Sequence, residues 1–116
     1  MSNTLGLPAK TCEIDRLITN SKDIEKVLAG KKTATRRNGR YADPGGRMVL
    51  KGHSFIVERV YEQTLGELTE TMALQEGYVS VEEYKNSILS SHPGMRWLPQ
   101  MKIWVHEFSP EEETTE

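Results

Sequence analysis

The chain has 116 residues, of which 36% are hydrophobic and 28% are charged, and its formal net charge is −2. This length fits one domain with a buried core, and the composition is ordinary for a globular protein. No apolar run is long enough to span a bilayer, the N-terminus lacks the pattern of a secretory signal, and Cys12 is the single cysteine. These features exclude an internal disulfide and predict a cytoplasmic protein without a membrane partner.

Both ends of the chain are expected to lie outside the folded domain. Residues 1–9 hold few large apolar side chains and are predicted to be flexible. Residues 109–116, SPEEETTE, contain four glutamates and no basic residue, which is typical of a disordered acidic tail. The domain is therefore expected to span residues 10–108.

The first predicted elements are a weak strand in residues 11–18 and a helix in residues 20–30. Asn20 or Ser21 can cap the start of the helix, and Gly30 can end it in the left-handed backbone region. The next segment, KTATRR, is expected to be extended, and NGRYADPGGR has the residues of a turn.

The second half of the chain alternates between strand and helix patterns. RMVL and SFIVERVYEQ predict two strands around a turn, and capping boxes at Thr64 and Ser80 each precede a predicted helix. HPGMRWLPQ is expected to be a loop, and MKIWVHEF a last strand in which His106 is the outward neighbour of Val105. Segregated strands and helices predict an α+β domain with a small curved sheet or barrel.

Basic residues are concentrated in the middle of the chain, where only Asp43 opposes them. This stretch is either an exposed edge strand protected from aggregation by its charges, or a site that recognises phosphate or carbonyl groups. Thr33 and Thr35 favour the second interpretation because they add hydroxyl groups beside the bases. The basic residues are Lys31, Lys32, Arg36, Arg37, Arg40, Arg47 and Lys51.

Glu76 stands in LQEGY, at the end of a helix that Gly77 is expected to terminate. A carboxylate at that position faces the negative end of the helix dipole, at a cost of about 0.3–1 kcal/mol on an exposed surface. This mismatch predicts that Glu76 has a partner elsewhere in the fold.

The three histidines and the two tryptophans are best explained as structural residues. Histidines 53, 92 and 106 are scattered along the sequence, and the chain has a single cysteine. No metal site and no cofactor are therefore expected. Trp97 is expected to pack in the core or at an edge of the sheet. The alternative for Trp97 is stacking on a nucleic-acid base.

Several of these segments, taken together, resemble the ASCH domain family. VLAGKKTATRR, the glycine turn before MVL, LGELTETMALQEGYVSVEEYKN and IWVHEF follow one another over roughly residues 14 to 108. This family is related to the PUA RNA-binding domain. The resemblance implies a small PUA-like β-barrel with flanking helices, a cleft lined by the GKKT loop, and RNA binding. It also implies a possible activity, because one small bacterial branch hydrolyses the acetyl group of N4-acetylcytidine.

The residues of that branch match four positions of this sequence. Lysine, threonine and glutamate fall on Lys32, Thr35 and Glu76, and a basic position falls on Arg37. The resemblance implies that Lys32 is the base, Thr35 the nucleophile and Glu76 the proton shuttle, a set of roles that amide hydrolysis requires. A regular strand would point Lys32 and Thr35 to opposite faces, so Lys32 must lie in the loop before the strand.

Three functions therefore remain open. The first is an amidohydrolase acting on N4-acetylcytidine, and the second is a non-catalytic RNA-binding module in which Trp97 or Tyr41 stacks on a base. The third, a ribonuclease, is disfavoured because there is no matched pair of histidines. The expected partner is RNA or a modified nucleoside and not DNA, and its predicted contacts are Lys31, Thr33, Arg36, Arg37, Arg40, Arg47 and Trp97.

Overall fold

The structure, a computed structural model, describes residues 13–94 and 96–111. The predicted flexible segment, residues 1–9, lies outside the described residues, as does most of the predicted tail. The last strand ends at Pro110, two residues beyond the predicted end of the domain. The elements are η1 (Ile14–Arg16), α1 (Ser21–Leu28), β1 (Ala34–Arg37), β2 (Arg47–Leu50), β3 (His53–Thr64), η2 (Leu65–Glu67), α2 (Glu70–Gln75), α3 (Val81–Ser91) and β4 (Lys102–Pro110).

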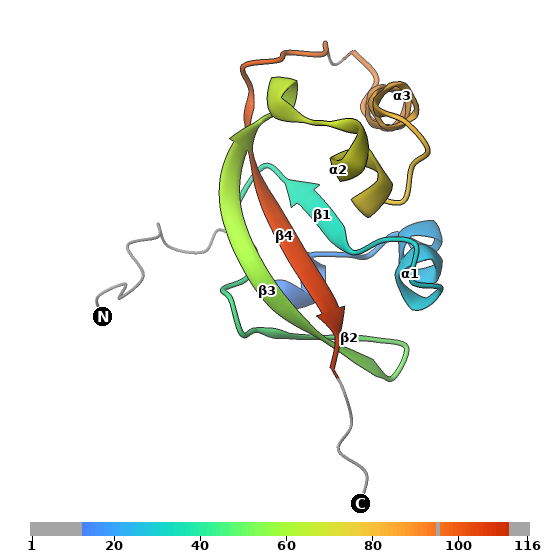
Figure 1. Cartoon of the computed structure of the whole chain (residues 1–116), viewed down its shortest axis with the longest axis vertical. Helices are drawn as coiled ribbons and strands as arrows, with labels where there is room; N and C mark the ends of the chain where they lie inside the picture. The colour runs from blue at the N-terminus through green and yellow to red at the C-terminus, as the bar shows by residue number, and fades with distance from the viewer. Residues whose placement is uncertain (1–12, 95, 112–116) are drawn as a thin grey trace, which may run out of the picture.

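The four strands form one antiparallel sheet in the order β1-β4-β3-β2. The long strand β3 bends along its length, and the sheet curls into a half-barrel (Figure 1). The strand β4 lies between β1 and β3, so that His106 is paired with Thr35 on one side and with Val60 on the other. This architecture confirms the predicted α+β class and the PUA-like curved sheet.

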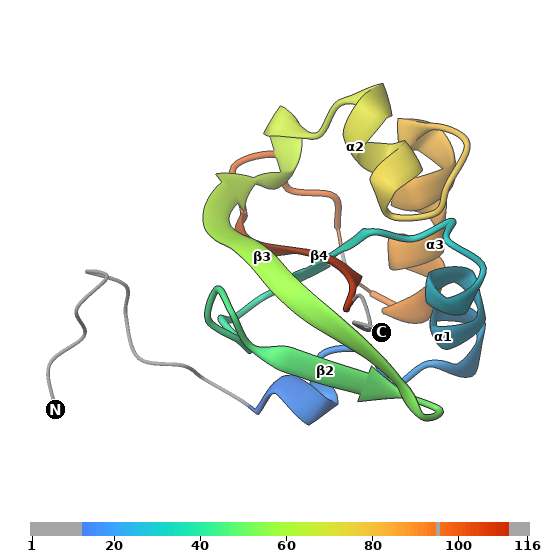
Figure 2. The ribbon, with the colours of Figure 1, turned by 60° about the horizontal axis from the view of Figure 1, so that its bottom comes forward.

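The three α-helices gather on one side of the molecule, next to the edge strand β1. The views of Figures 1 and 2 agree on this arrangement. The 3-10 helix η1 lies beside β2, and Val27 of α1 packs in one core cluster with Met48 of β2 and Phe55 of β3. Buried apolar side chains form three clusters. The largest contains Leu17, Ile18, Val27, Met48, Leu50, Phe55 and Phe108; the others contain Ala34, Leu65, Ile103 and Val105, and Leu68, Ala73 and Tyr84.

Both faces of β4 are covered in the middle of this strand. Val105 belongs to one apolar cluster and Phe108 to another, in accordance with the alternation expected of a strand. His106 is 0% exposed, so its prediction as an outward residue is wrong. The reason is that β4 is an interior strand with packed side chains on both faces, which a pattern of alternating residues does not reveal.

The predicted strand in residues 11–18 is also wrong for its described part. Residues 14–16 form the 3-10 helix η1, and the consecutive residues Leu17 and Ile18 are both buried. A half-buried strand would bury only alternate residues. The two predicted capping boxes do precede helical segments: Thr64 N–H donates to Glu67 Oε1 at 2.8 Å before η2, and Ser80 Oγ accepts from Glu83 N–H at 3.0 Å before α3.

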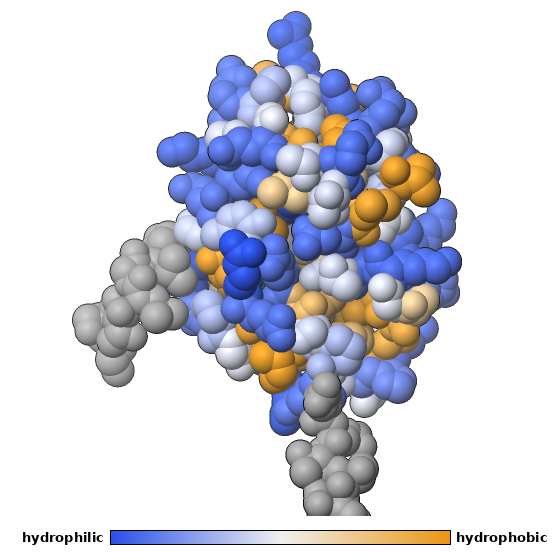
Figure 3. Space-filling model, viewed as in Figure 1, coloured by the Kyte–Doolittle hydropathy of each residue, from blue (hydrophilic) through white to orange (hydrophobic). Residues whose placement is uncertain are grey.

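Hydrophilic residues dominate the face of the molecule drawn in Figure 3, and the hydrophobic residues on it form separate patches. Large apolar residues that remain exposed include Val49, Leu74 and Val79. Within residues 13–94 and 96–111, no helix is both long enough and apolar enough to cross a membrane.

Candidate functional site

The candidate site is built where the C-terminal ends of α1 and α2 meet. Gly30 follows α1 with a φ of 78°, and Gly77 follows α2 with a φ of 91°, both in the region that favours glycine. After α1, Lys31 N–H donates to the Lys26 carbonyl at 2.8 Å, the bond that defines a Schellman motif. The same pattern of backbone bonds ends α2.

These two helix ends are in direct contact. A Cβ atom added to Gly77 would lie 2.9 Å from Lys26 Cδ and 3.6 Å from Lys32 Cβ, so the end of α1 lies directly against Gly77, whose backbone conformation favours glycine. Thr33 N–H donates to the Gln75 carbonyl at 2.7 Å. The segment leading into β1 is therefore fixed against the end of α2.

A buried cluster of three charged side chains lies at this junction. Lys32 Nζ is 2.7 Å from Glu76 Oε1, and Arg36 Nη1 is 2.8 Å from Glu76 Oε2. Arg36 Nε also donates to Gln63 Oε1 at 3.1 Å. Lys32, Arg36 and Glu76 are only 3%, 7% and 2% exposed. One carboxylate is thus shared by two cations, and the buried cluster has an excess of positive charge.

This cluster explains the presence of an acid at the end of α2. Lys32 Nζ donates to the main-chain carbonyl of Glu76 at 3.2 Å as well as to its carboxylate. A cation at the carbonyl end of a helix interacts favourably with the helix dipole. The partner expected for Glu76 is therefore provided by Lys32 and Arg36, which come from the segment before β1 and from β1 itself.

Beside the cluster lies a cavity of about 560 Å³ between α1, β1 and α3. Lys32 precedes the first residue of β1, Ala34, by two positions, which is the placement in the preceding loop that the predicted mechanism requires. Because β1 is an edge strand, residues from both of its faces reach the cavity. Its lining includes Lys22, Asp23, Lys26, Lys32, Thr35, Arg36, Arg37, Glu76, Tyr78 and Tyr84.

Two other titratable groups near the site are held in their neutral forms. Burial and, to a lesser extent, the Glu76 carboxylate raise the pKa of Tyr84, so this residue presents a phenol to the cavity. Burial lowers the pKa of His106 to about 4. His106 Nε2 accepts from Tyr41 N–H at 3.1 Å, which requires an unprotonated nitrogen. His106 lies opposite Thr35 across the β1–β4 pairing.

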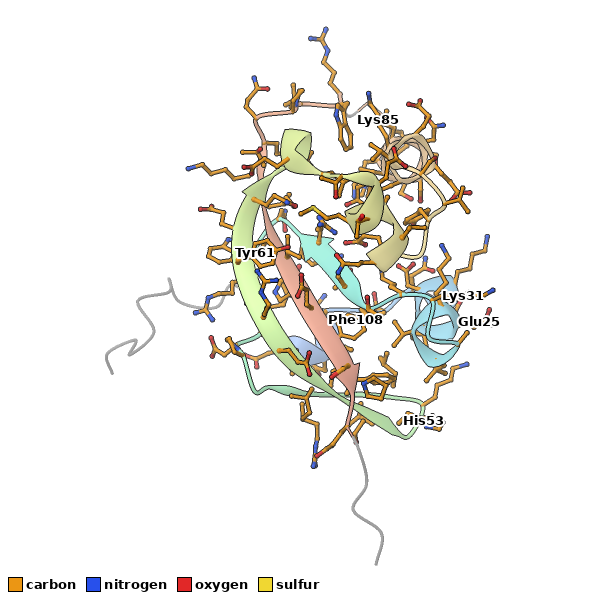
Figure 4. The ribbon with its side chains drawn as sticks, in the orientation of Figure 1. Glu25, Lys31, His53, Tyr61, Lys85 and Phe108 are labelled. Carbon is orange, nitrogen blue, oxygen red and sulfur yellow. The ribbon has the colours of Figure 1, made fainter. Side chains whose placement is uncertain are left out.

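Only some of the predicted contact residues lie at the cavity. Arg36 and Arg37 line it, whereas Lys31 and Thr33 are exposed and do not. Figure 4 shows Lys31 beside α1 at the outside of the molecule, in contrast to Phe108 in its interior.

The remaining predicted contacts are engaged elsewhere. Arg40 forms an ion pair with Asp43, and Arg47 pairs with Glu111 at 2.7 Å with a side chain that is 61% exposed. Trp97 packs edge-to-face against Tyr84 with ring centroids 6.5 Å apart, in accordance with the packing role first expected of it.

Two lysines of the cavity are absent from the sequence-based prediction. Lys22 and Lys26 both belong to α1 and line the cavity. Their separation of four residues places them on one side of the helix, which is the signal that would have identified them.

The fold is similar to that of solved structures, although no protein-family model and no curated protein matches the chain. An ASCH domain from Lactobacillus crispatus JV V101 gives a TM-score of 0.63 at 14% identity, over 85% of this chain and 79% of that chain. A protein of Enterococcus faecalis V583 from the family DUF984 gives 0.60 at 15% identity, over 88% and 74%. A hypothetical protein gives 0.58 at 18% identity, over 80% and 94%. The chain therefore has the fold of an ASCH domain.

Proposed function

We propose that the cavity binds a modified cytidine, free or within RNA, and that Lys32, Thr35 and Glu76 hydrolyse the acetyl amide of N4-acetylcytidine. The observation that supports this proposal most strongly is the position of Lys32 Nζ, 2.7 Å from Glu76 Oε1, in the lining of the cavity that also contains Thr35. A volume of about 560 Å³ falls in the range of small-molecule sites.

The proposed reaction begins with transfer of a proton from Lys32 to Glu76 across their short hydrogen bond. The neutral Lys32 amine accepts the proton of the Thr35 hydroxyl while the Thr35 oxygen attacks the acetyl carbonyl. In this proposal the positive charges of Arg36 and Arg37 stabilise the oxyanion. Glu76 then protonates the leaving cytosine N4, the C–N bond breaks, and water hydrolyses the acetyl ester on Thr35 to acetate.

Incubation of the protein with N4-acetylcytidine, followed by chromatography of the released cytidine, tests this proposal. Two substitutions of one residue separate chemistry from packing. Thr35→Val keeps the shape but removes the hydroxyl, and we expect a rate reduced by about 10²-fold or more. Thr35→Ser keeps the hydroxyl, and we expect measurable turnover.

Lys32→Ala is expected to abolish turnover, and Thr71→Ala, which changes an exposed threonine of α2, serves as the control. Absence of turnover by the unmodified protein, or equal rates in Thr35→Val and Thr35→Ser, would contradict the assignment.

The second candidate function is RNA binding without catalysis, which the exposed lysine next to the buried cluster favours. Lys31 is exposed and directly precedes Lys32, so it is accessible to a phosphate backbone outside the cavity. Binding of a single-stranded RNA by this route must weaken steeply with added salt, because phosphate contacts release counterions. A gel of the same RNA after incubation reveals any cleavage, and so tests the ribonuclease alternative in the same experiment.

A further inference from the structure

The walls of the cavity hold more positive than negative charge. Five basic and two acidic residues line it. The acid Glu76 is shared by Lys32 and Arg36. Lys22, Lys26 and Arg37 form no ion pair with any carboxylate of residues 13–94 and 96–111. Because a concave, partly desolvated surface concentrates the field of its charges, this cavity attracts anions.

Two guanidinium nitrogens at the cavity also lack partners. Arg36 Nη2 and Arg37 Nε are both buried, and neither has a hydrogen-bond acceptor among the residues that the structure describes. Buried N–H groups are nearly always paired in folded proteins, and an unpaired one is unfavourable. These two belong to consecutive residues that both line the cavity. Arg37 Nη2 donates to the main-chain carbonyl of Arg16 at 2.9 Å, and that interaction adds no negative charge. The two guanidinium groups therefore add positive charge to the cavity wall that no carboxylate fully balances.

The available cations come from side chains and not from the start of α1. Asn20 Oδ1 already accepts from the amides of Lys22 and Asp23, at 2.8 and 3.2 Å. The Lys22 and Lys26 side chains are one helical turn apart on α1. The Lys26 ammonium lies 4.0 Å from the centre of the Tyr78 ring. This contact with a neutral ring brings no negative charge to Lys26.

Building on the function proposed above, we propose that the ligand of this cavity carries a phosphate group, so that the substrate is a cytidine nucleotide and not the free nucleoside. A phosphate monoester has a charge near −2 at neutral pH and several strong acceptor oxygens. It can bind guanidinium N–H groups and ammonium groups at once. An uncharged nucleoside would leave the surplus charge of Lys22, Lys26 and Arg37 uncompensated.

The second cavity of the fold lacks these properties. It has a volume of about 780 Å³ and lies at the β2–β3 hairpin, where Arg47 and Glu111 line it together. These two residues neutralise each other in an ion pair. The excess of positive charge is therefore a property of the cavity beside β1.

Calorimetric titration of the full chain tests this inference, with cytidine, cytidine 5′-monophosphate, cytidine 3′-monophosphate, a cytidine dinucleotide and inorganic phosphate as ligands. We expect at least one of the phosphorylated cytidines to bind about tenfold or more tightly than cytidine in low salt, and this preference to shrink as salt is added. The tightest ligand identifies whether a terminal monoester or an internal diester is recognised.

The variant Lys22→Gln/Lys26→Gln is expected to reduce nucleotide affinity about tenfold and to leave the affinity for cytidine unchanged. Its matched control is Lys51→Gln/Lys102→Gln, which removes two exposed charges from residues that line neither cavity. Equal affinities for cytidine and all its phosphates would overturn the inference. So would inorganic phosphate that binds as tightly as the nucleotides, because it would indicate an anion site without base recognition.

Failure of this inference can be distinguished from failure of the proposed hydrolysis. A protein that prefers nucleotides but deacetylates neither N4-acetylcytidine nor its monophosphate has the phosphate site and lacks the proposed activity. A protein that deacetylates N4-acetylcytidine but binds cytidine and its phosphates equally has the activity and lacks the phosphate site.

Discussion

Arg36 and Arg47 show how differently two arginines of one basic stretch behave. Arg36 is buried and shares Glu76 with Lys32, whereas Arg47 is exposed and has Glu111 to itself. Water screens the exposed pair, so its contribution to stability is small. The buried cluster of Lys32, Arg36 and Glu76 is screened far less, and its excess of positive charge persists at the cavity. Burial and the ratio of cations to carboxylates, rather than the number of basic residues, therefore determine where a ligand can be held.

The largest expected effect comes from removing the carboxylate of the buried cluster. Glu76→Ala leaves the Lys32 and Arg36 cations without a counterion, and we expect a loss of about 3–5 kcal/mol in the free energy of unfolding. Chemical denaturation followed by circular dichroism measures this loss. A denaturation midpoint equal to that of the unmodified protein would mean that water solvates the cluster. The buried cluster and the exposed Arg47–Glu111 pair would then not differ in their contribution to stability.

Acid is expected to reveal the neutral histidine buried in the neighbouring strand. The pKa of His106 is lowered to about 4 in the folded protein, against about 6.5 in the unfolded chain. The unfolded chain therefore binds the additional proton between these values, and stability falls as pH decreases from about 6.5 to about 4, by up to about 3 kcal/mol.

Denaturation curves measured across this pH range test the prediction, and His106→Gln is the variant that should flatten the dependence. If the variant retains the full slope, other groups are responsible for it. The comparison between His106, which is buried in its neutral form, and Arg36, which is buried as a cation beside a carboxylate, would then fail.

A smaller loss is expected when Lys32 is replaced by an apolar residue of similar length. Lys32→Met leaves Glu76 paired with Arg36, so no buried charge is left without a partner. We expect a loss of about 1.5–3 kcal/mol in the free energy of unfolding, the contribution of hydrogen bonds to a charged group. Denaturation under the same conditions as Glu76→Ala gives the comparison. Equal losses in the two variants would show that the cations do not share the carboxylate as the distances indicate.

The smallest effect is expected at the exposed pair. Arg47→Ala removes a side chain that is 61% exposed, together with its contact to Glu111. We expect no measurable shift of the denaturation midpoint, because solvent competes for both ions. A shift comparable to that of Glu76→Ala would abolish the distinction between the two arginines.

Local signals predicted much of the fold and one important feature of the site. Helix caps, the turn glycines and alternating strands identified most elements correctly, because these signals depend on neighbours in sequence. The acid at the end of α2 also predicted a partner for Glu76. Local signals did not identify that partner, because Lys32 lies 44 residues away in sequence and the contact between the C-terminal ends of α1 and α2 brings it there. Only the resemblance to the ASCH domain family placed Lys32 and Glu76 in one site.

The errors concern properties that depend on the whole sheet. His106 is buried because β4 became an interior strand, and strand order does not follow from the pattern of a single segment. The position of Arg47 likewise depends on the sheet: it is close in sequence to the residues of the cavity beside β1, but it begins β2 and pairs with Glu111 near the β2–β3 hairpin. Lys22 and Lys26 lie on the charged side of α1, and only the packing of the fold shows that this side borders the cavity.

The hydrogen bond from Thr33 N–H to the Gln75 carbonyl makes the site's assembly observable at a single backbone amide. This bond joins segments that are distant in sequence, and it lies directly beside Lys32 and Glu76. An amide held in this way exchanges its hydrogen with solvent only when the contact opens. The exchange rate of Thr33 therefore measures how often the end of α2 separates from the strand, and so how often the two members of the ion pair part.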